Sequence, residues 1–228
     1  MRRLLLRGMD ALITNVPGYC VCVTTADCVP VLLYDKKQHV VAAVHAGWKG
    51  TVKHIVSNVM DHLNKMFGTQ GEDVIACIGP SISLESFEVG DEVYDAFEES
   101  GFDMSLISMK KKETGKYHID LWEANRIELL NLGVPAEQIE VAGICTYIHH
   151  DEFFSARRLG IDSGRTLSGI IDIIVVVDIF LIFINDVFIF AHVFEFLLQT
   201  GHVFRTVNDV LYLIAFLVQF FPKDVFQH

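Results

Sequence analysis

The sequence has few basic residues and no long uncharged apolar run. Eighteen lysines and arginines stand against twenty-nine aspartates and glutamates, which gives a formal net charge of −11. A broad nucleic-acid-binding surface needs a basic patch, so we expect no nucleic-acid partner. A transmembrane helix needs roughly 18 consecutive residues that are nearly free of charge, and charged residues interrupt each apolar stretch before that length. We therefore expect no membrane association.

Cysteine is also scarce. The five cysteines form an odd set without the spacing of a disulfide framework. The basic and apolar start at residues 2–7 is interrupted too soon to resemble a signal peptide. Reduced thiols in a cytoplasmic protein are the simplest account of both features.

Glycine and proline are nearly absent from residues 171–228. This segment holds one glycine, one proline, one arginine and one lysine, but eleven of the seventeen phenylalanines. The change in composition divides the chain into a domain of residues 1–170 and an apolar tail of residues 171–228. A buried extra layer, an interfacial hydrophobic helix and a non-native translated extension are the alternatives for the tail. We favour the last, because the tail has no capping or turn residues matched to its apolar pattern.

The sequence does contain a strand pair with a metal-ligand side chain at one end of each strand. Residues 29–34 and 40–44 are apolar runs of strand length, separated by a polar turn. Cys28 precedes the first strand, and His45 follows the second, 17 residues later. If the strands pair antiparallel, the thiol and the imidazole become neighbours and form half of a zinc or copper site. The alternative is a buried thiol near a hydrogen-bonded rim histidine.

Other segments predict an alternation of strands and helices. Further strands are expected at residues 10–15, 19–24, 74–78, 139–144 and 167–170. Apolar residues at helical spacing predict helices at residues 51–63, 91–97 and 118–130. Thr51 is the expected N-cap of the first helix, and His54 and His62 are expected on its solvated face.

Several charged side chains are candidates for chemistry. Arg157, Arg158 and Arg165 lie within nine residues, and Lys49 is a further cation. Guanidinium groups match phosphate oxygens in pairs, so these cations are candidates for an anion site, with an ordinary polar surface as the alternative. Asp27, before the first strand, either orients a ligand or moves a proton, or only caps the corner through backbone hydrogen bonds.

Four motifs carry a resemblance to a known family. They are Thr25-Ala26-Asp27-Cys28-Val29-Pro30-Val31-Leu32, Val44-His45-Ala46-Gly47-Trp48-Lys49-Gly50, Ile78-Gly79-Pro80-Ser81-Ile82 and Phe153-Phe154-Ser155-Ala156-Arg157-Arg158. With these motifs in order between residues 10 and 170, the chain resembles the YfiH-like family of polyphenol oxidase or laccase-domain proteins. The family includes purine nucleoside phosphorylases of the multicopper-oxidase-like type. The resemblance implies an α/β fold, a four-layer α/β/β/α sandwich.

The resemblance also implies a mononuclear metal, usually zinc, held by His, Cys and His. Cys28 matches the cysteine and His45 the second histidine. The implied substrates are purine nucleosides and phosphate: phosphorolysis of adenosine, inosine and methylthioadenosine, with adenosine deamination as a side activity. Copper-dependent phenol oxidation is the alternative. The other predicted site residues are Asp27, Lys49 and Arg157 as catalytic residues, and Arg158 and Arg165 as substrate-binding residues.

The chain departs from the family pattern in three places. The family's first metal histidine lies upstream of the Asp-Cys corner and here would precede Met1, so we expect a fold that is incomplete at its N-terminus. Lys49 stands where the family usually has arginine and lacks the planar fork of that side chain. The tail after Ile170 matches nothing in the family. With two of three ligands, we expect weak zinc binding and poor nucleoside turnover, and an inactive truncated module is the alternative to an enzyme.

Overall fold

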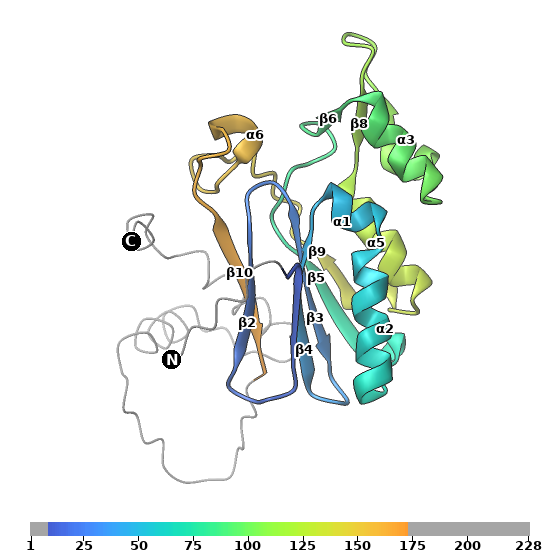
Figure 1. Cartoon of the computed structure of the whole chain (residues 1–228), viewed down its shortest axis with the longest axis vertical. Helices are drawn as coiled ribbons and strands as arrows, with labels where there is room; N and C mark the ends of the chain where they lie inside the picture. Colours follow the sequence, from blue (N-terminus) through green and yellow to red (C-terminus); the bar gives the residue numbers. More distant parts are fainter. Residues whose placement is uncertain (1–8, 173–228) are drawn as a thin grey trace.

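A five-stranded sheet forms the centre of the structure. In the computed structural model, which describes residues 9–172, its strands stand in the order β1-β4-β3-β5-β9. They are β1 (Ala11–Thr14), β4 (Val40–Ala46), β3 (Val29–Asp35), β5 (Val74–Ile78) and β9 (Ile139–Val141). Neighbouring strands are antiparallel except β5 and β9, which are parallel. Figure 1 shows this sheet between a layer of helices and a second, smaller sheet.

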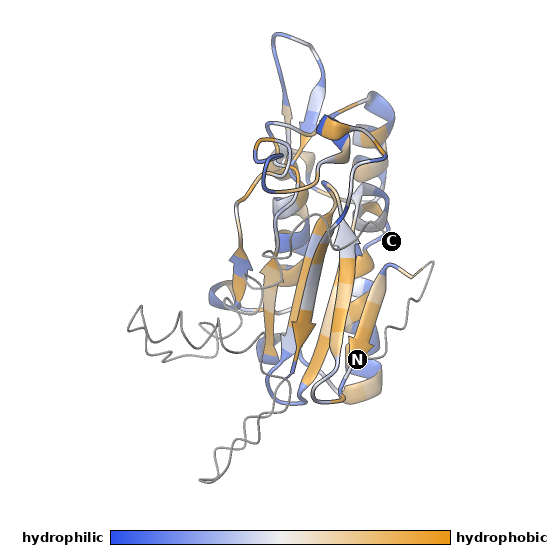
Figure 2. Ribbon diagram, turned by 90° about the vertical axis from the view of Figure 1, so that its left-hand side faces the viewer, coloured by the Kyte–Doolittle hydropathy of each residue, from blue (hydrophilic) through white to orange (hydrophobic). Residues whose placement is uncertain are grey.

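Alternating side chains of β3 and β4 face two different cores. On β4, Ala42 and Val44 pack into the larger core, whereas Val41 and Ala43 pack into the smaller one. Both faces of these strands are therefore buried, which explains why their sequences are continuous apolar runs rather than alternating ones. In Figure 2 these strands are coloured mostly as hydrophobic, whereas many of the loops that join them are coloured as hydrophilic.

Helices cover the face of the large sheet that borders the larger core. They are α1 (Trp48–Val52), α2 (Ile55–Phe67) and α5 (Leu121–Asn131). The longest of them, α2, buries Val56, Val59, Met60 and Leu63, which recur at helical spacing. This spacing is the pattern from which the helix was predicted.

A two-stranded antiparallel sheet covers the opposite face. It consists of β2 (Cys20–Thr25) and β10 (Thr166–Ile171), and it contributes Val23 and Ile170 to the smaller core. This mixed α/β architecture with one sheet packed on another confirms the predicted fold class. Three of the four predicted layers are formed by residues 9–172; an outer helical layer on the small sheet is not among the described residues.

A third small sheet lies at one end of the molecule, the upper end in Figure 1. Its strands stand in the order β6-β8-β7. They are β6 (Glu88–Val89), β8 (Tyr117–Ile119) and β7 (Ser108–Lys110). The remaining elements are α3 (Asp91–Glu99), α4 (Met104–Ile107), α6 (Ala156–Leu159) and two 3-10 turns at Gly71–Asp73 and Ala136–Gln138.

The helix predicted at residues 51–63 begins differently. Gly47 is the N-cap of α1, and Thr51 lies inside that helix, where its hydroxyl donates to the Gly47 carbonyl. His54 then adopts a left-handed conformation with φ of 54°, which separates α1 from α2. His54 therefore lies between two helices and not on a solvated helix face as predicted: its ring is 43% exposed, stacks on Phe102 and bonds the Ser100 carbonyl oxygen.

Two other boundaries were also wrong. His118 and Ile119 belong to β8, and the helix begins only at Leu121, because the Asp120 side chain accepts the backbone N–H of Glu123 as an N-cap. The strand predicted at residues 139–144 ends at Val141. Gly143 follows with a positive φ of 66°, which turns the chain away from the sheet.

The predicted tail falls outside this structure. Residues 173–228 lie outside the described residues, so the boundary at residue 170 stays a prediction. Within residues 9–172, none of the helices combines the length and the apolar character needed to cross a membrane.

Candidate metal centre

Cys28 and His45 lie at the same end of the β3–β4 pair. The antiparallel register places Val29 opposite Ala46, and Pro30 opposite His45. The start of β3 is therefore beside the end of β4, as the sequence predicted. Because successive side chains alternate, His45 is on the face of β4 that carries Val41 and Ala43, toward the small sheet.

The Cys28 and His45 side chains meet over Gly47. A β-carbon placed on Gly47 would lie 3.0 Å from Cys28 Sγ and 3.7 Å from His45 Nε2. A hydrogen bond with Cys28 is the main cause that raises the pKa of His45 to about 9, against the opposing effect of burial. A sulfur and an imidazole nitrogen from two strand ends thus converge on one point.

Asp10 supports His45 from the other side of the ring. Its Oδ1 lies 3.0 Å from His45 Nδ1, and the His45 backbone N–H donates to its carbonyl oxygen at 2.7 Å. Asp10 raises the pKa of His45 further. A carboxylate beside Nδ1 favours a proton on that nitrogen, so in the neutral ring the lone pair lies on Nε2, the nitrogen nearer Cys28.

Cys28 and His45 are suitable types of ligand for zinc, but two protein ligands are fewer than a zinc site normally has. Thiolate sulfur and imidazole nitrogen are common zinc ligands, and catalytic sites use three protein ligands. In the described part of the chain, no group of three or more His, Cys, Asp or Glu side chains is arranged to hold a metal ion. His118 in particular is buried elsewhere, with Nδ1 bonded to the Leu84 carbonyl oxygen.

Asp27 holds three segments together at the corner before Cys28. Its Oδ1 accepts the Thr146 hydroxyl at 2.8 Å, and its Oδ2 accepts the Arg157 backbone N–H at 2.7 Å. Its carbonyl oxygen accepts the Ile82 backbone N–H. Asp27 is 9% exposed and has a left-handed φ of 79°. The bond to the Arg157 backbone N–H is of the kind that the capping alternative describes, and a catalytic role for Asp27 stays a prediction.

Two of the predicted cations flank this corner. The Arg157 guanidinium donates to the Glu88 carbonyl oxygen at 2.8 Å and lies 5.3 Å above the Phe87 ring. The Arg158 guanidinium lies 5.0 Å above the Tyr147 ring. Both side chains are exposed on α6, which Asp27 anchors through its bond to the Arg157 backbone.

The other two predicted cations have contacts with residues close to them in sequence. Arg165 donates to the Ser163, Gly164 and Ile161 carbonyl oxygens, all in its own loop. Lys49 is exposed on α1, and its ammonium lies 5.4 Å above the Trp48 ring. The predicted substrate-binding role of Arg165 and the catalytic role of Lys49 stay predictions.

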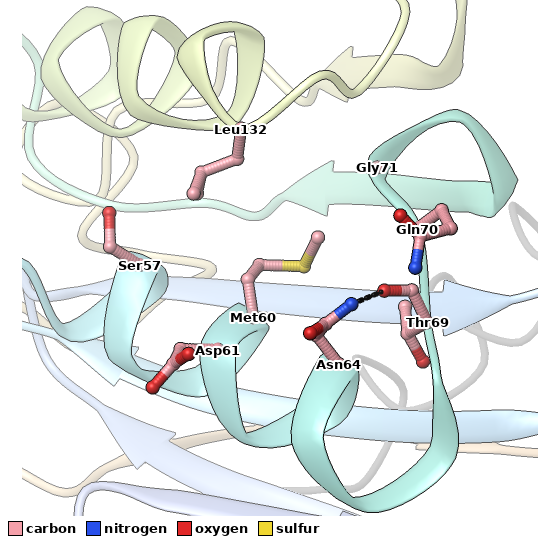
Figure 3. Close-up of a pocket in the computed structure, with 8 residues that line it drawn as sticks. All are labelled: Ser57, Met60, Asp61, Asn64, Thr69, Gln70, Gly71 and Leu132. Atoms are coloured by element: carbon pink, nitrogen blue, oxygen red, sulfur yellow. Dashed lines mark hydrogen bonds between the residues drawn. The ribbon is translucent and has the colours of Figure 1, made fainter.

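A hollow beside α2 lies away from these residues. It has a volume of about 230 Å³ and lies between the helix and the turn before β5 (Figure 3). Its lining residues are Ser57, Met60, Asp61, Asn64, Thr69, Gln70, Gly71 and Leu132. None of the predicted site residues is among them, so this hollow gives no support to the predicted chemistry.

Asp10 and Thr146 contact the predicted site residues but were not themselves predicted from the sequence. Asp10 reaches His45 because β1 pairs with β4, and no local pattern indicates that pairing. Thr146 is 119 positions from its partner Asp27. A carboxylate at the first residue of a predicted strand was the available signal for Asp10, whereas Thr146 had none.

Comparison with known proteins identifies the family of this chain. The sequence profile of the family described as multi-copper polyphenol oxidoreductase laccase matches residues 2–172. A purine nucleoside phosphorylase of Bacteroides thetaiotaomicron is 68% identical over 74% of this chain and 63% of its own length. Adenosine deaminase RL5, from an unknown prokaryotic organism, is 47% identical over 72% of this chain and 63% of its own length.

Solved structures share the fold. Bacillus licheniformis hypothetical protein YfiH superposes with a TM-score of 0.67 and 36% identity, over 72% of this chain and 61% of that protein. YlmD from Geobacillus stearothermophilus superposes with a TM-score of 0.68 and 32% identity, over 73% of this chain and 62% of that protein. The chain therefore spans less than two thirds of the length of the relatives it matches.

Proposed function

Because this chain belongs to the multi-copper polyphenol oxidoreductase laccase family, we propose that it is a metal-dependent purine nucleoside phosphorylase with adenosine deaminase side activity. Relatives that carry these two names support the proposal. The observation that carries it is the meeting of Cys28 Sγ and His45 Nε2 over Gly47.

The proposed metal is zinc, with Cys28 and His45 as two of its ligands. When bound, zinc supplies a Lewis acid and lowers the pKa of water toward neutrality. Asp10 would hold the proton on His45 Nδ1 and so keep Nε2 available as a donor. The usual set of three protein ligands needs one more, which the described residues do not supply at this point.

The proposed main reaction is phosphorolysis of adenosine, inosine and methylthioadenosine. A phosphate oxygen attacks the ribosyl C1′, the bond from C1′ to the purine breaks, and its electron pair leaves with the base, which takes up a proton. Arg157 and Arg158 are the cations that we propose for phosphate, with Arg165 and Lys49 as further contributors. The anchoring of α6 by Asp27 would keep Arg157 in place during binding.

Adenosine deamination is the second activity. Water adds to C6 of adenine, and ammonia leaves, which gives inosine. The deaminase relative at 47% identity favours this candidate. Both reactions would use the same Cys28–His45 centre, so loss of Cys28 should abolish both.

The test is purine release from inosine in phosphate buffer with added zinc. The proposal predicts hypoxanthine and ribose 1-phosphate in equal amounts, with no product after Cys28→Ala. Because a third ligand is missing from the described residues, the assay is repeated with millimolar imidazole, which can occupy that position. Oxygen consumption with a phenol substrate and added copper, without any purine release, would instead favour the hypothesis of copper-dependent phenol oxidation. If no product forms under any of these conditions, the alternative of an inactive module is the one supported.

The compartment that we propose is the cytoplasm. The five cysteines all lie among the described residues, and no disulfide joins any of them. Free thiols persist where glutathione and thioredoxin keep proteins reduced.

A further inference from the structure

Two cysteines of β2 present their sulfurs side by side. Cys20 and Cys22 are two residues apart on one strand, so both project from the same face, opposite to Val23 in the small core. Their Sγ atoms are 3.3 Å apart, and both residues are partly exposed. This face of the small sheet points away from the five-stranded sheet (Figure 1).

A glycine on the neighbouring strand makes room for both sulfurs. Gly169 pairs with Cys22 in the β2–β10 register. A β-carbon at Gly169 would lie 2.5 Å from Cys22 Sγ and 3.1 Å from Cys20 Sγ, which is too close for any other residue without movement. The two sulfurs therefore occupy the space above this glycine.

The pair carries a thiolate near neutral pH. A hydrogen bond with Cys22 is the main cause that lowers the pKa of Cys20 to about 7, against the opposing effect of burial. A thiolate, rather than a thiol, is the form that binds metal ions.

The other cysteines have different surroundings. Cys28 bonds His45. Burial raises the pKa of Cys77 to about 11, and Cys145 is buried beside Ser83 and Ser86. Among the residues that the structure describes, Cys20 and Cys22 are thus the thiols placed to act as a pair.

We propose that Cys20 and Cys22 form a second metal site, a two-thiolate chelate for a soft monovalent ion, Cu(I). Thiolates are the ligands that select Cu(I) in proteins. Cu(I) with two thiolate ligands is close to linear, so two metal–sulfur bonds of about 2.3 Å would hold the sulfurs about 4–4.6 Å apart. The sulfurs are now 3.3 Å apart, and rotation of the two side chains away from each other would open the pair to that separation. Binding releases the remaining thiol proton to solvent and transfers no electron.

This inference is independent of the proposed nucleoside chemistry. The test therefore uses the Cys28→Ser protein, in which the first candidate site has lost its sulfur. Cu(I) is supplied without oxygen and titrated against a colorimetric Cu(I) chelator. The proposal predicts one tightly held Cu(I) per chain, and an affinity at least about 100-fold lower after Cys20→Ser or Cys22→Ser.

Two further measurements separate loss of ligands from loss of fold. Cys77→Ser in the same background should keep the full Cu(I) affinity. In the Cys28→Ser protein, one equivalent of Cu(I) should protect Cys20 and Cys22 from alkylation, as read by mass spectrometry of the peptides. Binding that is unchanged by Cys20→Ser and Cys22→Ser, or equal alkylation with and without Cu(I), would overturn the proposal. Zinc added at the same concentration should protect the pair less, because two thiolates leave half of its tetrahedral shell to water.

Discussion

The thiol of Cys28 and the imidazole of His45 are hydrogen-bonded to each other beside the α-carbon of Gly47. Each side chain comes from a different strand end, and the β3–β4 register brings the two ends together. Asp10 contacts the far nitrogen of the ring, so the imidazole is held from both sides. A metal ion between sulfur and nitrogen would need no rearrangement of the strands.

Gly47→Ala should weaken zinc binding about tenfold or more, because metal sites lose that much affinity when ligands are displaced slightly. The new methyl group would lie 3.0 Å from Cys28 Sγ. Isothermal titration calorimetry with zinc measures the effect. Gly50→Ala is the matched control, since its β-carbon would meet nothing nearer than 3.5 Å and alanine favours a helix. Equal zinc affinities for the two variants would contradict the geometry of the site.

The stability of the metal-free protein should depend on the protonation of His45. Its pKa is raised from 6.5 to about 9 in the folded state, chiefly by the hydrogen bond with Cys28. Folding therefore favours the protonated ring, and this stabilisation is full below pH 6.5 and disappears as the pH rises through 9. We expect the Tm in the presence of a chelator to fall over that range. Cys28→Ser removes the main cause, so a Tm fall of the same size in that variant would contradict the assignment.

Asp27→Asn should destabilise the protein by about 1–3 kcal/mol, the usual cost of leaving a buried hydrogen-bonding group unsatisfied. Asparagine tolerates the left-handed backbone of this position, so the change isolates the side-chain contacts. One amide oxygen cannot replace both carboxylate oxygens, which accept from Thr146 and Arg157. Urea unfolding measures the loss. Thr146→Val removes one of the two contacts and should cost less than Asp27→Asn; the opposite order would show that Asp27 is not the centre of this corner.

Arg157→Met should weaken phosphate binding at least about tenfold, because a charge-assisted hydrogen bond contributes about 1.5–3 kcal/mol. Arg165→Met should have a smaller effect, since its guanidinium donates to three carbonyl oxygens of its own loop. Calorimetric titration with inorganic phosphate compares the two. Arg126→Met serves as the control, because Arg126 is paired with Glu123 on α5. A loss as large for Arg126→Met as for Arg157→Met would point to a non-specific effect of charge.

The strand pair and its two ligand-type side chains were predictable because they depend on local order. Two apolar runs joined by a short polar turn form an antiparallel pair, and that geometry alone brings Cys28 beside His45. The core positions of α2 were predictable for a similar reason, since Val56, Val59 and Leu63 follow the period of a helix.

Contacts between distant segments were not predictable in this way. Asp10 reaches His45 only because β1 is a neighbour of β4, and Asp27 meets Arg157 across 130 residues. His118 was predicted to begin a helix, but the helix begins two residues later, after its N-cap Asp120. His118 instead belongs to a strand whose partners, β6 and β7, come from other parts of the chain. The structure at these residues depends on which distant segments pair in the fold, and a single sequence contains little information about that pairing.

The most direct test of the central claim is X-ray absorption at the zinc edge, made on zinc-loaded protein that carries Cys20→Ser and Cys22→Ser. The account predicts one sulfur at about 2.3 Å and imidazole nitrogen at about 2.0–2.1 Å from zinc, with the sulfur lost when Cys28→Ser is added. A zinc shell of nitrogen and oxygen alone, or a sulfur that persists after Cys28→Ser, would contradict it.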